Sequence, residues 1–286
     1  MQIGFIGVGA MGGGLARNLI RAGKEVLVYD LNPEAVKRTL DAGTTGKAAT
    51  QGQELASADI VFTSLPLPQH LEETMLGQTG LLNAMKAGAA YIDVSTIDPQ
   101  TAIKLSKAAE AAGVKFLECP LGKTPAQAET AEEPIFVGGD EAVYQELKPI
   151  LEIVGNPIYY MGTIEAACAL KLISNLIGMT NLAVIAEGMR IGEKAGIEPN
   201  YLLELLGDTG AKSFQMDVRG PWIASGDFNS RFGLDLALKD VRLGVEMARA
   251  WGNDARTMQV TLDYLKQGSA NGLGKEDCNA MYKIIK

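Results

Sequence analysis

The stretch IGFIGVGAMGGGLARNLIRAG, residues 3–23, decides the fold of the first half of the chain. It contains Gly7, Gly9 and Gly12 in the spacing Gly-x-Gly-x-x-Gly, directly after a predicted strand and directly before a predicted helix. One such glycine permits a tight turn, one lets the backbone approach a pyrophosphate, and one lets the helix pack closely on the strand. The helix N-terminus offers its unpaired N–H groups to phosphates. The stretch predicts a dinucleotide-binding turn; the alternative is a tight corner without a ligand.

An acidic residue follows the second predicted strand, which ends at Tyr29 and is followed by Asp30. A carboxylate at this place accepts hydrogen bonds from the adenosine ribose hydroxyls and repels a 2′-phosphate. The next residues are Leu31 and Asn32, so no arginine follows directly. We therefore expect NAD(H) rather than NADP(H) as the cofactor. The residues of this part expected to bind it are Gly7, Gly9, Ala10, Met11, Gly12 and Asp30.

Short apolar runs alternate with helical patterns through the first half of the chain. This alternation predicts βαβ units, and hence a doubly wound parallel α/β sheet of the Rossmann type with helices on both faces. Strands are expected at Gln2–Ile6, Glu25–Tyr29, Ile60–Ser64, Ala90–Val94, Lys115–Glu118 and Ile135–Val137, and helices at Met11–Ala22, Pro33–Ala42 and Pro99–Ala112.

Strand patterns stop near Gly162, and only helical patterns follow. They are expected at Ile164–Ala195, Pro199–Leu206, Ser213–Ser225, Leu234–Trp251 and Asp254–Gly268. A chain of 286 residues has room for two domains. We therefore expect a Rossmann domain over residues 1–162 and an all-helical domain over residues 163–286.

Composition excludes several classes of protein. The chain carries 26 Lys and Arg against 34 Asp and Glu, a net charge of −8, which argues against nucleic acid or an anionic membrane as a partner. The single histidine, His70, and three widely spaced cysteines argue against a metal site and a Ser-His-Asp triad. No targeting segment is evident, and the apolar stretch over Ile164–Met189 carries charged residues at intervals. We expect a cytoplasmic protein without a membrane span.

The long predicted helix carries a narrow polar stripe. Spacings of three and four residues place Lys171, Ser174, Asn175 and Gly178 on one face of an otherwise apolar helix. Such a stripe could line a substrate cleft, and a lysine ammonium could donate a proton to a carbonyl oxygen. The alternative is a face exposed to solvent.

At these residues the chain resembles the β-hydroxyacid dehydrogenase family, whose type member is 3-hydroxyisobutyrate dehydrogenase. The resemblance runs through nearly the whole length, in order. It rests on the glycine stretch, Ser64-Leu65-Pro66, Asp93-Val94-Ser95-Thr96, the loop after Cys119-Pro120, Lys171-Leu-Ile-Ser-Asn175 and FGLDLALKD over Phe232–Asp240.

The resemblance implies hydride transfer between a nicotinamide and a short acid, and a helical domain that forms homodimers or homotetramers. It implies that Lys171 is the catalytic acid/base and that Asn175 orients the substrate. Two interpretations stay open for Asp240: a tie to the site, or an ion pair on the helix surface. The remaining implied contacts are Ser95, Gly122, Lys123, Thr124, Ser174 and Gly178 with substrate, and Leu65, Pro66, Thr96 and Lys239 with cofactor.

One loop departs from the family pattern. Where the family has Ser-Gly-Gly, this chain has Gly122-Lys123-Thr124, and AETAEEPIF over residues 128–136 replaces the usual Gly-Thr-Leu run. The Gly-basic-Thr pattern is similar to that of the sulfolactaldehyde reductase subgroup. An ammonium beside a hydroxyl and loop N–H groups can hold a sulfonate. The alternative for Lys123 is a solvated loop lysine.

These observations lead to one preferred function and two alternatives. The preferred function is NADH-dependent reduction of a short anionic aldehyde, 3-sulfolactaldehyde to 2,3-dihydroxypropane-1-sulfonate. Within the same class, the substrate could carry a carboxylate, as in 3-hydroxyisobutyrate, 3-hydroxypropionate or succinic semialdehyde. In another class, the chain would be a dinucleotide-binding module without catalysis.

Overall fold

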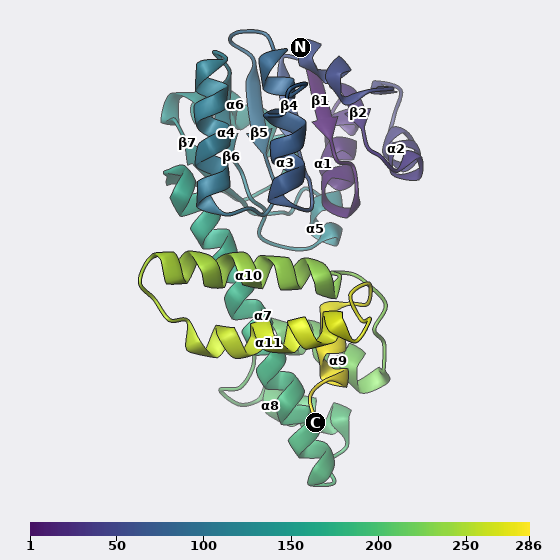
Figure 1. The fold of residues 1–286 in the computed structure, drawn as a ribbon. Coiled ribbons are helices and arrows are strands. Elements are labelled where there is room, and N and C mark those ends of the chain that lie inside the picture. The colour runs from purple at the N-terminus through teal and green to yellow at the C-terminus, as the bar shows by residue number, and fades with distance from the viewer. The chain divides into compact units, whose positions relative to one another are not determined.

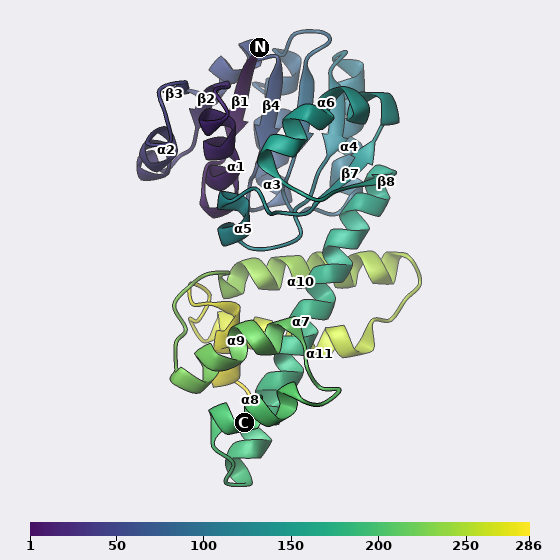
Figure 2. The same cartoon turned by 180° about the vertical axis from the view of Figure 1, so that it is seen from behind.

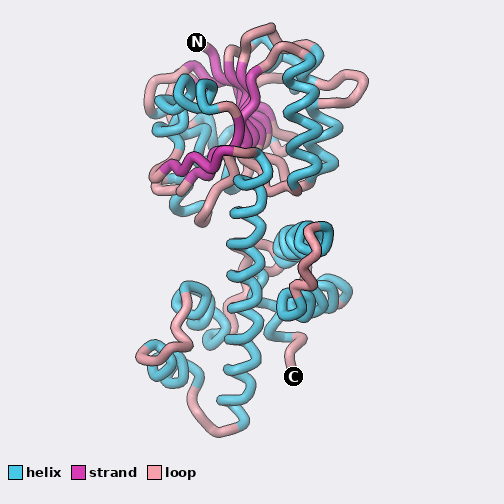
Figure 3. The backbone as a smooth tube through the Cα atoms, turned by 90° about the vertical axis from the view of Figure 1, so that its left-hand side faces the viewer, coloured by secondary structure: helices cyan, strands magenta, loops and turns pink.

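The computed structural model describes residues 1–286, which form two compact units, Met1–Lys171 and Leu172–Lys286. The division lies inside one long helix, α7 (Ile164–Lys194), which Figure 3 shows as uninterrupted. The first turns of α7 belong to the first unit, because Ile164 and Cys168 pack in its apolar core. The boundary expected from the sequence, 162/163, falls before this helix.

The first unit is built on one sheet of eight strands in the order β3-β2-β1-β4-β5-β6-β7-β8 (Figure 1). The chain winds outward from β1 to β3 and then in the other direction from β4, which is the doubly wound Rossmann arrangement. The strands are β1 (Gln2–Ile6), β2 (Glu25–Tyr29), β3 (Gly46–Ala48), β4 (Ile60–Thr63), β5 (Ala90–Asp93), β6 (Lys115–Glu118), β7 (Ile135–Gly139) and β8 (Ile158–Gly162).

The sheet differs from the prediction at its edges. The short edge strand β3 and the opposite edge strand β8 were not predicted, because neither has the buried apolar run that marks the central strands. Strand β7 pairs antiparallel with β6, whereas every other neighbouring pair is parallel. Apolar runs indicate that a strand is buried, but they carry no information on its direction.

Helices cover both faces of this sheet. They are α1 (Ala10–Arg21), α2 (Pro33–Leu40), α3 (Pro68–Met75), α4 (Pro99–Ala111), α5 (Pro125–Glu129) and α6 (Glu141–Val154), with 3-10 turns η1 (Gly52–Ser57) and η2 (Leu81–Asn83). Helices α3 and α4 lie on the face seen in Figure 1, and α1 and α6 on the face seen in Figure 2. Each face has its own core: Leu71 and Leu105 are buried on one side, Leu15 and Leu147 on the other.

The second unit is helical. Besides the remainder of α7 it contains α8 (Pro199–Gly207), α9 (Phe214–Ser225), α10 (Leu234–Ala250), α11 (Arg256–Ala270) and the 3-10 turn η3 (Cys278–Lys283). Helix α10 packs closely on α7 at Gly244, where a Cβ would lie 2.7 Å from the Leu176 side chain. The five helices expected in this half of the chain are all present.

Helix α7 is long and apolar enough, by length and composition alone, to cross a membrane. Its residues Leu176, Leu182 and Ala186 are buried in the core of the second unit. The apolar residues that give α7 the composition of a membrane span therefore form part of the apolar core of this unit.

Candidate active site

The three glycines of the first loop have different physical roles. Gly7 has φ of +84°, and a Cβ there would lie 2.3 Å from the Ser64 carbonyl oxygen. A Cβ at Gly12 would lie 2.0 Å from the carbonyl oxygen of Gly7. A Cβ at Gly9, in contrast, meets no atom within 4 Å. Gly7 and Gly12 are thus required by the turn and by close packing, whereas Gly9 leaves open space in which a ligand can approach the backbone.

The helix that follows is open to an anion at its start. Helix α1 is preceded by Gly9 as N-cap, which has no side chain to accept hydrogen bonds from the first-turn N–H groups. No acidic residue lies in that turn. The positive end of the helix dipole, including Ala10 and Met11, therefore faces the space above Gly9 without a competing carboxylate. These features fit the pyrophosphate of a dinucleotide.

Asp30 is held beside the glycine loop. Its Oδ2 accepts a hydrogen bond from the Val8 N–H at 2.8 Å, and its Oδ1 accepts one from the Asn32 N–H at 2.8 Å. Both oxygens keep lone pairs for ribose hydroxyls. The neighbouring Leu31 is 89% exposed and carries no charge. The carboxylate is therefore fixed in place, with no basic side chain directly after it.

The predicted cofactor and substrate residues of the first unit gather at one edge of the sheet. The glycine loop follows β1, Asp30 follows β2, Leu65 and Pro66 follow β4, and Ser95 and Thr96 follow β5. Since these strands are parallel neighbours, their carboxyl ends meet at the point where the winding direction reverses. Ligands of open α/β sheets bind in the crevice outside such a switch point.

A buried hydrogen-bond network lies directly beneath this edge. Thr63 and Ser95 donate hydroxyl hydrogens to Asp93 Oδ1, at 2.6 Å and 2.7 Å. The Leu65 N–H donates in turn to Ser95 Oγ at 2.9 Å. Ser95 is only 4% exposed, so in this structure it links β5 to the loop after β4. Asp93 belongs to the motif Asp93-Val94-Ser95-Thr96 but was not among the predicted site residues; in the structure it orients the Ser95 hydroxyl.

A second buried carboxyl lies beside Asp93. Glu118 pairs with it in register across β5 and β6, and both residues are fully buried. Burial, together with the negative charge of Asp93, raises the pKa of Glu118 well above its usual range. The Asp93 carboxylate receives two hydroxyl donors, whereas burial beside Asp93 favours the protonated form of Glu118. Sequence analysis missed Glu118, because its strand carries no motif.

The loop expected to bind the substrate anion uses several of its donors internally. The Gly122 N–H donates to the Pro134 carbonyl at 2.9 Å, and the Lys123 N–H donates to Glu133 Oε1. The Thr124 hydroxyl donates to the Gln127 side chain. The Lys123 side chain is exposed. The Lys123 ammonium is thus accessible to an anion from solvent. The N–H groups of Gly122 and Lys123 and the Thr124 hydroxyl, in contrast, already donate within the segment.

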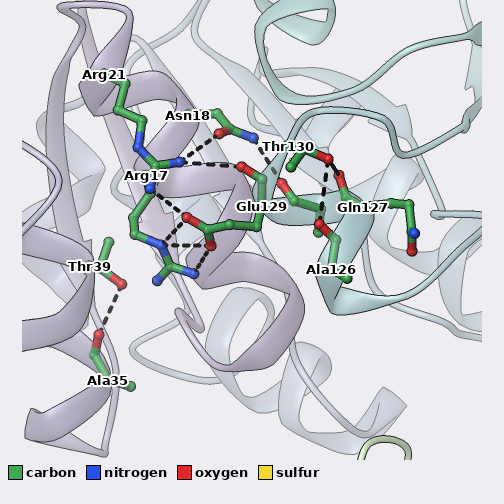
Figure 4. Close-up of polar contacts among 10 residues, drawn as sticks. Arg17, Asn18, Arg21, Ala35, Thr39, Ala126, Gln127, Glu129 and Thr130 are labelled. Carbon is green, nitrogen blue, oxygen red and sulfur yellow. Dashed lines mark hydrogen bonds and ion pairs between the residues drawn. The ribbon is translucent and has the colours of Figure 1, made fainter.

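Helix α5, which follows this loop, is clamped to the helix of the glycine motif (Figure 4). Arg17 and Arg21 of α1 both pair with the carboxylate of Glu129. Asn18 donates to the Ala128 carbonyl oxygen at 2.8 Å. A Cβ at Gly14 would lie 2.9 Å from the Ala128 backbone. Helix α1 and helix α5, which follows the Gly122–Thr124 loop, therefore form one packed assembly within the first unit.

In the second unit, Asp240 joins two of the predicted site residues. Asn175 Nδ2 donates to Asp240 Oδ2 at 2.7 Å. Lys239 Nζ lies 2.6 Å from Asp240 Oδ1, with both side chains at most 5% exposed. Asp240 is therefore not a surface ion pair, one of the two interpretations left open by the sequence. Its carboxylate contacts both the Asn175 amide of α7 and the Lys239 ammonium of α10, and so holds these two groups close to each other.

The polar stripe of α7 follows the spacing expected from the sequence. Lys171, Asn175 and Gly178 are half-buried, and Ser174 is exposed. A Cβ at Gly178 would lie 3.1 Å from the Gln215 side chain. The absence of a side chain at this position therefore leaves room on α7 for Gln215 of α9. Lys171 ends the first compact unit and Asn175 follows one turn later on the same helix.

The doubly wound sheet, the open glycine loop and the fixed carboxylate after β2 define a dinucleotide-binding protein. Residues 2–162 match the family described as the NAD binding domain of 6-phosphogluconate dehydrogenase. Residues 166–285 match the family described as NAD-binding of NADP-dependent 3-hydroxyisobutyrate dehydrogenase.

Whole-length relatives agree with these matches. The 2-(hydroxymethyl)glutarate dehydrogenase of Eubacterium barkeri is 34% identical over 286 residues, 99% of this chain and 94% of that protein. The 3-hydroxyisobutyrate dehydrogenase of Pseudomonas aeruginosa is 32% identical, over 87% of this chain and 86% of that protein. The crystal structure of 3-hydroxyisobutyrate dehydrogenase from Salmonella typhimurium aligns with a TM-score of 0.91 at 28% identity, covering 99% of each chain.

The chain belongs to the β-hydroxyacid dehydrogenase family, that of 3-hydroxyisobutyrate dehydrogenase. It is a nicotinamide dinucleotide-dependent oxidoreductase that acts on CH–OH groups. The family and the two-part fold expected from the sequence are confirmed. The sulfolactaldehyde reductase subgroup, the choice of NAD over NADP and the roles of individual site residues stay predictions.

Proposed function

We propose that this protein catalyses the reversible, NAD(H)-dependent interconversion of a short hydroxy acid and its aldehyde, with an anionic group on the substrate. The observation that carries this proposal is the buried network of Asn175, Asp240 and Lys239. Burying an ion pair in a helical core is costly in desolvation, and an apolar pair would fill the same space. In this network the Asp240 carboxylate holds the Asn175 amide and the Lys239 ammonium in fixed positions, as an amide that orients a substrate requires.

Each residue of the proposed site has one task. Bound NAD(H) supplies or accepts the hydride. Lys171 gives a proton to the carbonyl oxygen during reduction and removes one from the hydroxyl during oxidation. Asn175 orients the substrate with the amide atoms that its bond to Asp240 leaves available. Lys123 attracts the anionic end of the substrate.

We propose a carboxylate as the anionic group of the substrate. A sulfonate has three oxygens that need hydrogen-bond donors. The N–H groups of Gly122 and Lys123 and the hydroxyl of Thr124 already donate to acceptors within their own segment. By its name, the relative from Eubacterium barkeri acts on a hydroxymethyl dicarboxylate. The candidates are 3-hydroxyisobutyrate, 3-hydroxypropionate and succinic semialdehyde.

A sulfonate substrate, 3-sulfolactaldehyde, is the second candidate. The Gly122-Lys123-Thr124 pattern favours it, since it places an ammonium and a hydroxyl side by side. The ratio of kcat/KM for a matched sulfonate and carboxylate aldehyde separates the two. A preference of about tenfold or more for the carboxylate, roughly 1.4 kcal/mol of transition-state binding, supports the first candidate. The reverse preference establishes the second.

We propose NAD(H) as the physiological cofactor, because the fixed Asp30 carboxylate would repel a 2′-phosphate. Asp30→Asn keeps the size of the side chain and removes its charge. We expect the ratio of kcat/KM for NADH over NADPH to fall about tenfold or more. Asp41→Asn, at an exposed carboxylate after α2, is the control and should leave the ratio unchanged. An unchanged ratio in Asp30→Asn would show that Asp30 does not select the cofactor.

We also propose that the protein is a homo-oligomer that uses the exposed apolar side of α7. Ile173, Ile177, Val184 and Ile191 are 43% to 69% exposed, and their spacing of four and seven residues places them on one helix face. An apolar stripe of this kind is typical of an interface between chains. Replacing Ile177 and Val184 by Glu should lower the molecular mass measured by light scattering to that of a monomer. A wild-type protein that is already monomeric would contradict this proposal.

A further inference from the structure

Glu133 is a buried carboxyl group that has no part in the site described so far. It is fully buried in the AETAEE segment just before β7. Its Oε1 accepts the Lys123 N–H, and its Oε2 has no hydrogen-bond partner. Buried carboxyl oxygens are nearly always hydrogen-bonded, because an unpaired buried polar atom is unfavourable. A negative charge on this group would therefore be poorly stabilised by hydrogen bonds.

Two cations act electrostatically on Glu133, one from the Gly122–Thr124 loop and one from α7. Lys123 lies in the substrate loop, and Lys171 lies on α7. Burial raises the pKa of Glu133 to about 7, although the Lys123 N–H and the charges of Lys171 and Lys123 act in the opposite direction. The neighbouring Glu132 is exposed to solvent. Burial thus favours the protonated form of this carboxyl up to near neutral pH, directly beside the backbone of the Gly122–Thr124 loop.

The charge on Glu133 decides how strongly these lysines attract an anion. When the carboxyl is protonated, Glu133 adds no negative charge beside the loop that is assigned to the substrate anion. When it is ionised, it offsets the charge of the lysines and repels the anion through a medium of low polarity. The N–H and hydroxyl donors of the loop already form hydrogen bonds within the segment. The attraction of the loop for the substrate anion therefore depends mostly on the charges of the lysines.

We propose that Glu133 is a positioning residue whose protonation state sets the affinity of the Gly122–Thr124 loop for the anionic end of the substrate. The proposal rests on the proposed function, because it assigns that loop to the substrate anion. It gives the enzyme tight substrate binding on the acid side of neutrality and weaker binding on the alkaline side.

The test compares wild-type protein with Glu133→Gln from about pH 6 to about pH 8.5. Glutamine keeps an oxygen acceptor for the Lys123 N–H but stays neutral at every pH. For the wild type we expect the KM of an anionic aldehyde to rise about tenfold as the pH increases past 7, with kcat following a separate profile. In Glu133→Gln the KM should stay at its low-pH value throughout. Glu132→Gln removes an exposed charge one residue away and should behave as wild type.

A binding measurement separates this proposal from the proposed function. Calorimetric titration of the NADH-loaded protein with succinate, an unreactive dicarboxylate, should show pH-dependent affinity in the wild type and none in Glu133→Gln. If succinate binds in this way but no aldehyde is turned over, the proposed function is wrong and the role of Glu133 stands. If turnover is normal but the KM profile of Glu133→Gln matches that of the wild type, Glu133 has no such role. Failure of succinate to bind would overturn the proposal as well.

Discussion

Replacing Lys171 by Met lowers kcat/KM for the anionic aldehyde by about 10²- to 10⁴-fold, the usual contribution of a positioned general acid. Methionine keeps the length of the unbranched side chain and removes the ammonium. Lys171 lies half-buried on α7, and the flexible methionine side chain adapts readily to such a setting. The affinity for NADH, measured by fluorescence titration, should change little, because we propose that the glycine loop and Asp30 bind the cofactor.

The matched control is Lys194→Met in the last turn of the same helix, where the lysine is exposed. It removes the same charge from the same element and should leave kcat/KM unchanged. Near-normal turnover of the Lys171→Met protein would show that Lys171 does not transfer the proton. Loss of NADH binding in Lys171→Met would instead point to a structural defect, which a circular dichroism spectrum would reveal.

Replacing Asp240 by Ala destabilises the second unit by roughly 3 kcal/mol or more. The change takes the carboxylate from the buried Lys239 ammonium and the acceptor from the Asn175 amide. Removing one member of a buried ion pair is far more destabilising than removing a surface one, since a buried charge loses its counter-charge. Urea unfolding of wild type and variant measures the difference in the free energy of unfolding. Turnover should fall as well, because Asn175 is no longer oriented.

Glu246→Ala on the same helix is the control for this prediction. Glu246 is exposed and lies 3.9 Å from Arg242, so the loss of this pair should change the free energy of unfolding by less than about 1 kcal/mol. Asp240→Asn offers a milder test, because its amide oxygen still accepts from Asn175. Equal stability of Asp240→Ala and Glu246→Ala would show that the buried network contributes nothing to folding.

Local sequence patterns were sufficient for most of the fold. The glycine spacing predicts both the turn at Gly7, where φ is +84°, and the close packing of Gly12 on the Gly7 carbonyl, because these two requirements arise within one short stretch of chain. Apolar runs predict the central strands and the helices of the second unit. The edge strands β3 and β8 escaped prediction because they are short or half-exposed, and the reversed direction of β7 leaves no mark on its composition.

The site was harder to predict, since its decisive contacts join residues that are distant in the sequence. Asn175 and Asp240 are 65 positions apart, and only the packing of α10 on α7 brings them together. Glu133 sits ten positions after Lys123 in a segment that departs from the family pattern. Its role depends on burial, which the sequence of this loop does not indicate. The signal that could have found it is an acidic residue only two positions before the apolar run of β7.

The central claim is that this chain transfers hydride between NAD(H) and a short anionic aldehyde. Steady-state NADH oxidation with equal concentrations of succinic semialdehyde, methylmalonate semialdehyde and sulfolactaldehyde tests it most directly, with NADPH in parallel. We predict turnover with NADH, and kcat/KM at least about tenfold higher for a carboxylate aldehyde than for the sulfonate. Absence of NADH oxidation with all three aldehydes, in protein that binds NADH, would contradict the claim.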